Sequence, residues 1–257
     1  MSDTCLSIII PVYNGEKTIS ELFNQINDFC NKHEFTFEVI FIWDCGLDDS
    51  WQVIQKIKSQ NPENVKGIHL SRNFGQHNAI LAGIDIAKGE FIITMDEDLQ
   101  HSPKDILLLI EKQKETSADV VYGKYSELNH SYFRNITTII MKKMLRISIP
   151  ELHHEYSAFR LIKASIAKEI TKMSNSYTFL DGYLSWLTSC IYFVPVSHNR
   201  RVGGKSSYST KKLIEHSIHI FATFSNLPIR FLSKLSIIIF ISTFIYSLYI
   251  ALRVIIM

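Results

Sequence analysis

Three acidic residues directly follow an apolar run in the stretch FIITMDEDLQ, residues 91–100. The apolar part predicts a buried strand, and side chains two residues apart in a strand point to the same side. Asp96 and Asp98 can therefore converge beyond the carboxyl end of the strand, where open α/β sheets bind ligands. Because two close carboxylates repel each other, they favour a proton or a divalent cation between them. The alternative is an acidic loop that caps a helix starting at Ser102 and Pro103.

Short apolar runs of strand length alternate with segments of helical spacing. The predicted strands are residues 6–10, 37–43, 67–70, 91–95 and 119–122, and the predicted helices are residues 18–33, 49–59, 78–87 and 103–115. This alternation predicts an α/β fold, a Rossmann-like and mostly parallel sheet flanked by helices. A net charge of +2 without a polybasic face argues against a nucleic-acid partner.

Polar residues also follow the first two predicted strands. Pro11 and Tyr13 lie in the turn after the first strand, and Asp44 follows the second. If these strands are parallel neighbours of the strand that ends at Asp96, all these groups line one crevice suited to a nucleotide. Tyr13 offers a flat face to a base, and Asp44 offers acceptor oxygens to a base N–H or a ribose hydroxyl. The sequence has neither a Gly-x-Gly-x-x-Gly nor a Walker A motif, so a metal on the acid pair would have to balance phosphate charge.

Two basic segments have the composition of anion-binding loops. One is RNFG at residues 72–75, and the other is RRVGGKSSYS at residues 200–209. Glycine allows close approach of backbone amides to an anion, and Arg or Lys adds charge-assisted hydrogen bonds to phosphate oxygens. The alternative for both segments is a plain solvated loop.

The C-terminal part of the sequence has the length and composition of a membrane-spanning helix. Residues 235–252 carry no charge, and basic residues precede them. This pattern predicts a catalytic domain at 1–210, an amphipathic juxtamembrane helix at 211–231 and a transmembrane helix at 232–257, with a buried core helix as the alternative. The positive-inside bias, and a first apolar run with no basic region before it, predict a catalytic domain on the cytoplasmic face of the cell membrane. Residues 131–146 form a basic amphipathic stretch that suits either a solvated domain face or a membrane-surface helix.

Taken together, these motifs resemble family 2 glycosyltransferases of the GT-A fold. The closest resemblance is to the polyprenyl-phosphate branch that includes dolichol-phosphate mannose synthase. The matching segments are residues 7–14, 72–83, 96–103 (DEDLQHSP), 159–161 and 201–209. The resemblance extends over nearly the whole chain, and the acidic segment is the most specific of these matches.

The resemblance implies an inverting enzyme that moves a sugar from a UDP- or GDP-linked donor to a polyprenyl phosphate, with Mg²⁺ or Mn²⁺ as cofactor. A phosphate acceptor is already an anionic nucleophile, so no general base is required. The implied partners are the nucleotide sugar, the lipid phosphate and the membrane, with a homo-oligomer as a further possibility. The implied site residues are Asp98, Arg201 and Lys205 for catalysis; Pro11, Tyr13, Asp44, Arg72 and Asp96 for the donor; Asp96, Asp98 and Gln100 for the metal; and Lys124, Arg134, Arg201 and Ser206 for the acceptor phosphate.

The chain departs from the family pattern at several of these places. Trp43 replaces the first acid of an Asp-Asp pair, and Lys124 replaces a common arginine. Gly15 stands where the branch usually has Glu, while Glu97 stands at the Ala of the Asp-Ala-Asp motif and is expected to point away as a spacer. These departures keep two alternatives open. One is a family 2 enzyme that adds a sugar to a hydroxyl in surface polysaccharide assembly, and the other is a catalytically impaired membrane partner subunit.

The segment just before residues 159–161 bears on the acceptor. Ser157 and Ala158 lie where many relatives carry an acid. A hydroxyl acceptor needs a general base, whereas a phosphate acceptor does not. Their identity therefore favours the phosphate acceptor.

Overall fold

The computed structural model of the chain describes residues 5–125, 149, 155–173, 178–197, 199, 223 and 227–256. The chain divides into two compact units. The first comprises residues 1–135 and 151–207, and the second comprises residues 136–150 and 208–257.

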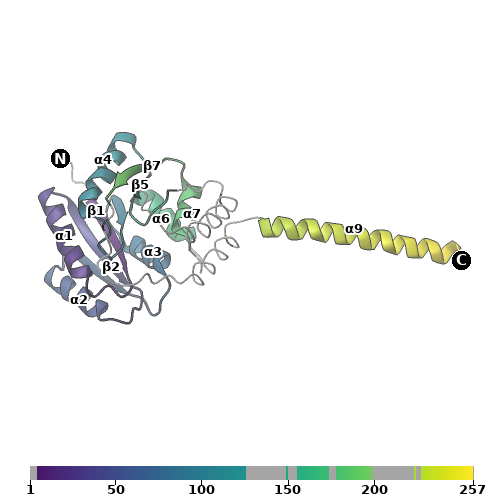
Figure 1. Cartoon of the computed structure of the whole chain (residues 1–257), viewed down its shortest axis with the longest axis horizontal. Coiled ribbons are helices and arrows are strands. Elements are labelled where there is room, and N and C mark those ends of the chain that lie inside the picture. Colours follow the sequence, from purple (N-terminus) through teal and green to yellow (C-terminus); the bar gives the residue numbers. More distant parts are fainter. Residues whose placement is uncertain are drawn as a thin grey trace. The chain divides into compact units, whose positions relative to one another are not determined.

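The first unit is built on a twisted sheet in the order β3-β2-β1-β4-β6-β5-β7 (Figure 1). Its strands are β1 (Cys5–Val12), β2 (Thr36–Trp43), β3 (Val65–His69), β4 (Phe91–Thr94), β5 (Val120–Tyr125), β6 (Arg160–Lys163) and β7 (Ile191–Val196). Within the described residues, only β6 runs antiparallel to its neighbours. The predicted mostly parallel α/β sheet is confirmed.

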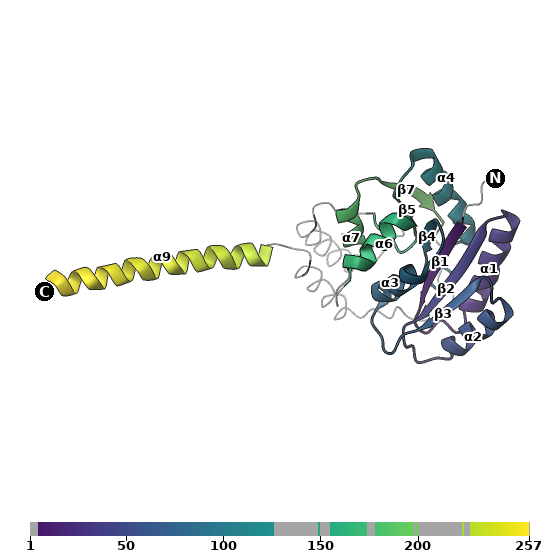
Figure 2. The ribbon, with the colours of Figure 1, turned by 180° about the vertical axis from the view of Figure 1, so that it is seen from behind.

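Helices cover both faces of this sheet (Figures 1 and 2). The helices are α1 (Ile19–Lys32), α2 (Ser50–Gln60), α3 (Gln76–Ile86), α4 (Ile106–Thr116), α6 (Ala164–Met173) and α7 (Leu180–Leu187), and a short 3-10 helix at Pro103–Asp105 leads into α4. Helix α3 packs on β1, β2 and α6, and α6 packs on α7, whereas α1 packs on α2 and on the 3-10 helix. The central strands are buried on both faces, as their continuous apolar runs require.

The register of the parallel strands brings three loops to one edge of the sheet. Val12 pairs with Trp43 at the carboxyl ends of β1 and β2, and Ile9 pairs with Thr94 at the carboxyl end of β4. The segments that start at residues 13, 44 and 95 therefore leave the sheet side by side. This is the edge at which the sequence predicts a ligand site.

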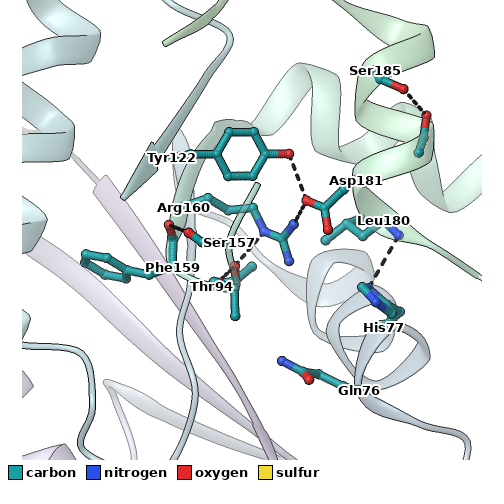
Figure 3. A network of polar contacts seen from close by, with 12 residues as sticks. Gln76, His77, Thr94, Tyr122, Ser157, Phe159, Arg160, Leu180, Asp181 and Ser185 are labelled. Carbon is teal, nitrogen blue, oxygen red and sulfur yellow. Dashed lines mark hydrogen bonds and ion pairs between the residues drawn. The ribbon is translucent and has the colours of Figure 1, made fainter. Parts of the chain in front are cut away.

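A buried ion pair connects the antiparallel strand to its neighbours (Figure 3). Arg160 on β6 pairs with Asp181 on α7, and the two side chains are only 1% and 3% exposed. Tyr122 on β5 donates its hydroxyl to Asp181 Oδ1 at 2.8 Å, and Arg160 Nε donates to Thr94 Oγ1 on β4 at 3.0 Å. Burial and the charge of Asp181 raise the pKa of Tyr122, so this phenol stays protonated and remains a donor. The network thus joins three strands and a helix.

The second unit contains the long helix α9 (Leu227–Ile256). Pro228 lies in its first turn, where the missing N–H of proline costs no helical hydrogen bond. The apolar stretch Ile229–Ile256 has 28 residues, enough at 1.5 Å per residue to cross a hydrocarbon core of about 30 Å. Large apolar side chains along it are exposed, including Ile237, Phe240 and Phe244. By length and composition this helix could cross a membrane.

The buried ion pair yields a prediction for stability. Asp181→Ala leaves the Arg160 guanidinium buried without its counter-charge, so the free energy of unfolding should fall by about 3–5 kcal/mol. Denaturant unfolding in detergent measures this change. Glu169→Ala, which breaks the exposed Lys172–Glu169 pair, is the control and should cost about 0–1 kcal/mol. Equal, small losses in the two variants would contradict a structural role for the buried pair.

Candidate active site

The acid pair follows β4 directly, and each carboxylate has a defined hydrogen-bond donor. Gln76, the first residue of α3, donates its side-chain amide to Asp96 Oδ1 at 2.6 Å. The backbone N–H of Gln100 donates to Asp98 Oδ1 at 3.1 Å, because the chain turns back at Leu99 with a φ of 62°. Asp98 is 7% exposed. The two acids therefore lie at the carboxyl edge of the parallel strands, and their binding of a metal stays a prediction.

His101 forms a hydrogen bond within the same loop. Its Nδ1 accepts the backbone N–H of Asp96 at 3.2 Å, which leaves the proton on Nε2 to donate to the Tyr125 hydroxyl. The imidazole also stacks on the rings of Tyr125 and Phe159. Neither His101 nor Gln76 is among the predicted site residues, since neither has a spacing signal that points to its partner.

Glu97, between the two aspartates, does more than act as a spacer. Its side chain is partly buried against the turn that follows β1, opposite Gly15. Burial raises the pKa of Glu97 to about 8, and the charge of Asp96 and, less strongly, that of Asp98 add to this effect. Hydrogen bonds from its own backbone N–H and from the Tyr13 backbone N–H act in the opposite direction.

Asp44 ties the end of β2 to the RNFG segment. Its two oxygens accept the backbone N–H groups of Phe74 and Gly75 at 2.7 and 2.8 Å. Burial raises the pKa of Asp44, which is 3% exposed, while these two hydrogen bonds lower it. Arg72 lies in the same segment, with its guanidinium 4.7 Å from the centre of the Phe74 ring. Asp44 therefore has a structural task at the site, and its contact with a nucleotide base stays a prediction.

At the end of β2, Trp43 takes the place of the first acid of the expected acidic pair. The Trp43 ring packs against His69 and Trp51, with ring centres 4.4 and 6.3 Å apart. Its buried indole N–H has no hydrogen-bond partner among the described residues. The loops after β1 and β2 are joined instead by Asn14, whose side-chain oxygen accepts the Leu47 backbone N–H at 2.6 Å.

The structure describes only some of the residues on the predicted acceptor side. Lys124, near the end of β5, forms an exposed ion pair with Glu155. Ser157 donates its hydroxyl to the backbone carbonyl of Gly123 at 2.7 Å. The other predicted residues lie outside the described part of the chain, namely Arg134, Arg201, Lys205 and Ser206.

Two hydrogen bonds link the acidic loop to Asn199. The backbone N–H of Asn199 donates to the Gln100 carbonyl at 3.0 Å, and the Gln100 side-chain amide donates to the Asn199 carbonyl at 3.4 Å. Residues 200–209 follow Asn199 directly. Asn199, the residue before the basic segment, is therefore hydrogen-bonded to the acidic loop.

The acids suit a metal that is shared with a ligand. Within the described ranges, no group of three or more His, Cys, Asp or Glu side chains is arranged to hold a metal. Mg²⁺ is usually bound through one or two carboxylates together with substrate phosphates and water. Asp96 and Asp98 supply such a donor set, so they fit a divalent metal bound together with a diphosphate.

Solved structures identify the class of fold. A structure of TarS from Staphylococcus aureus in complex with UDP-GlcNAc superposes with a TM-score of 0.56 at 20% identity, over 84% of this chain and 65% of that chain. Glucosyl-3-phosphoglycerate synthase from Mycobacterium tuberculosis, in complex with Mn²⁺, UDP and glucosyl-3-phosphoglycerate, gives a TM-score of 0.60 at 17% identity, over 86% of this chain and 78% of that chain. The fold is therefore the GT-A fold, as predicted.

Sequence comparison then identifies the family. Residues 7–171 match the model of glycosyl transferase family 2. The uncharacterized glycosyltransferase YkcC of Bacillus subtilis is 31% identical over 245 residues, which are 93% of this chain and 74% of that protein. The undecaprenyl-phosphate 4-deoxy-4-formamido-L-arabinose transferase of Proteus mirabilis is 29% identical over 252 residues, 97% of this chain and 77% of that protein. The chain belongs to glycosyl transferase family 2 and is a glycosyltransferase.

The Gln76–Asp96 contact gives a prediction for metal binding. Gln76→Ala removes the group that orients Asp96, and the loss of such a supporting contact typically weakens metal binding tenfold or more. We expect about a tenfold weaker Mn²⁺ affinity in the presence of a nucleoside diphosphate, measured by electron paramagnetic resonance. Gln25→Ala removes a similar amide–carboxylate contact to Glu21 on the exposed face of α1 and should leave Mn²⁺ affinity unchanged. An unchanged affinity in Gln76→Ala would show that Asp96 needs no such support.

Proposed function

We propose that this glycosyltransferase moves a sugar from a UDP- or GDP-linked donor to a polyprenyl phosphate at the cytoplasmic face of the membrane, with inversion at the anomeric carbon. The observation that carries the proposal is the pair Asp96 and Asp98, held by separate donors at the ligand edge of a GT-A sheet. Relatives named as undecaprenyl-phosphate sugar transferases support the lipid acceptor.

Mg²⁺ or Mn²⁺ would be held by Asp96 and Asp98, with Gln100 as the predicted third ligand. When bound, the metal supplies positive charge that stabilises the departing nucleoside diphosphate. The Mn²⁺ and UDP in the mycobacterial synthase support this cofactor. The tasks of the chain itself are to orient the two carboxylates, through Gln76 and the Gln100 backbone, and to align the donor.

The donor nucleotide would lie across the ends of β1 and β2. In this arrangement Tyr13 and Pro11 face the base, Arg72 approaches the diphosphate, and Asp44 fixes the loop that carries Arg72. The complex of TarS with UDP-GlcNAc supports a nucleotide sugar as the donor.

The acceptor would enter from the side of the basic loop. The contacts between Gln100 and Asn199, the residue before this loop, support a role of the loop's cations at both the acceptor phosphate and the diphosphate. A lipid phosphate is already ionised, which agrees with Ser157 and Ala158 in place of an acid before β6. The residues assigned to the acceptor and to charge stabilisation are Lys124, Arg134, Arg201, Lys205 and Ser206.

Membrane attachment would serve the same reaction. Helix α9 has the length and apolar surface to anchor the chain near a lipid substrate. We assign residues 1–210 to catalysis, 211–231 to a juxtamembrane helix and 232–257 to the span. Basic residues before the span favour the cytoplasmic face.

The transfer itself can be measured with the full chain in liposomes that contain undecaprenyl phosphate. Labelled UDP- and GDP-sugars with Mn²⁺ should give label in a mild-acid-labile lipid. Asp98→Asn should reduce the rate about a hundredfold or more, because metal stabilisation contributes several kcal/mol to the barrier. Asp28→Asn on the exposed face of α1 is the matched control. Label that enters only a hydroxyl acceptor, or transfer that persists in Asp98→Asn, would contradict the proposal.

Orientation in the membrane gives a separate prediction. Leu47 is 91% exposed, so a cysteine introduced there is accessible to reagents. In spheroplasts of an expression host, Leu47→Cys should escape a membrane-impermeant maleimide until the cells are permeabilised. Native Cys30 should stay unlabelled throughout, since burial raises its pKa to about 12. Labelling of Leu47→Cys in intact spheroplasts would place the domain on the opposite face.

A further inference from the structure

The first turn of α3 carries two consecutive side chains that contact different parts of the first unit (Figure 3). Gln76 donates to Asp96 Oδ1 at 2.6 Å, on the loop after β4. The next residue, His77, points in a different direction, and its Nδ1 accepts the Leu180 backbone N–H at 3.4 Å. Neighbouring residues of a helix are about 100° apart around its axis. One turn of α3 can therefore hold the acidic loop and the start of α7 together.

The start of α7 takes this acceptor from α3 because it has no cap of its own. Phe179 precedes the helix and has no side-chain oxygen, while Leu180 is fully buried. The first N–H groups of a helix find no acceptor within it, and a buried N–H without a partner costs stability. The His77 ring also meets the Phe179 ring edge-on, with ring centres 5.4 Å apart. His77 thus contacts α7 through both its nitrogen and its ring.

The next residue of α7, Asp181, leads back to the strand that carries the acid pair. Asp181 forms the buried ion pair with Arg160 on β6, and Arg160 Nε donates to Thr94 Oγ1 at 3.0 Å. Thr94 ends β4, two residues before Asp96. The two contacts of α3 close this path, since they join α7 to Asp96. A buried ion pair is costly to break, so it gives the first turn of α3 a fixed support.

We propose that His77 is a positioning residue of the metal site, which holds the first turn of α3 against α7 so that Gln76 orients Asp96. Through this residue the buried Arg160–Asp181 pair also acts on the site. The proposal rests on the proposed function, in which Asp96 binds the metal together with the donor diphosphate.

Two variants of the full chain in detergent separate the nitrogen of His77 from its ring. His77→Phe keeps an aromatic ring beside Phe179 but removes the acceptor. It should accelerate hydrogen exchange of the Leu180 amide about tenfold. It should also weaken Mn²⁺ binding in the presence of a nucleoside diphosphate about fivefold, measured by electron paramagnetic resonance. His77→Asn places an acceptor oxygen one bond beyond Cγ, where histidine has Nδ1, and should restore both values to near those of the wild type.

A double-mutant cycle tests whether His77 acts through Gln76. In a Gln76→Ala background, His77→Phe should cause no further loss of Mn²⁺ affinity, because the group that it positions is already absent. His33→Phe is the matched control. The His33 ring packs on Phe29 at the end of α1, with ring centres 4.7 Å apart, and this variant should leave Mn²⁺ affinity unchanged.

The two proposals fail in different ways. Unchanged Leu180 exchange or unchanged Mn²⁺ affinity in His77→Phe would overturn the role of His77, as would equal losses in His77→Asn or a loss that adds to that of Gln76→Ala. Should His77→Phe not fold, His77→Ala takes its place in each comparison. The exchange measurement needs no ligand. A wild-type chain that binds no Mn²⁺ with a nucleoside diphosphate would instead overturn the proposed function.

Discussion

Crowding of negative charge at the end of β4 is the constraint on which the site depends. Asp96, Glu97 and Asp98 are consecutive, and in a partly buried place their mutual repulsion must be offset. The pKa of Glu97 is raised, and each aspartate receives a donor from a different direction: the Gln76 amide for Asp96 and the Gln100 backbone for Asp98. Elements far apart in the sequence thus meet at the two aspartates, α3 through Gln76 and the loop after β4 through Gln100.

The sheet makes this convergence possible. Parallel strands end at the same edge of the sheet, so the loops after β1, β2 and β4 start next to one another. On the other side of β4, the antiparallel strand β6 is fixed by the buried Arg160–Asp181 pair. The donor side of the proposed site is therefore built on parallel strands. Its acceptor side starts from β6 and from the segment that Gln100 holds at Asn199.

The sequence predicts most of this fold because apolar runs of strand length and helical spacing are local signals. It also predicts the acid pair, since the period of a strand places Asp96 and Asp98 on one side. It does not predict what surrounds them. Gln76 and Asp96 are 20 residues apart, and Glu97 lies against Gly15, which is far earlier in the chain. The sequence predicts that Asp44 lies at the end of a strand. Its hydrogen-bond donors, the backbone N–H groups of Phe74 and Gly75, are known only from the folded loop.

The central claim is that Asp96 and Asp98 bind a divalent metal together with the donor diphosphate. Anomalous diffraction from Mn²⁺ in crystals grown with a nucleoside diphosphate measures this directly. A peak between the two carboxylates and the diphosphate is predicted, and it should vanish in Asp98→Asn. A bound nucleotide with no Mn²⁺ peak at these residues would contradict the claim.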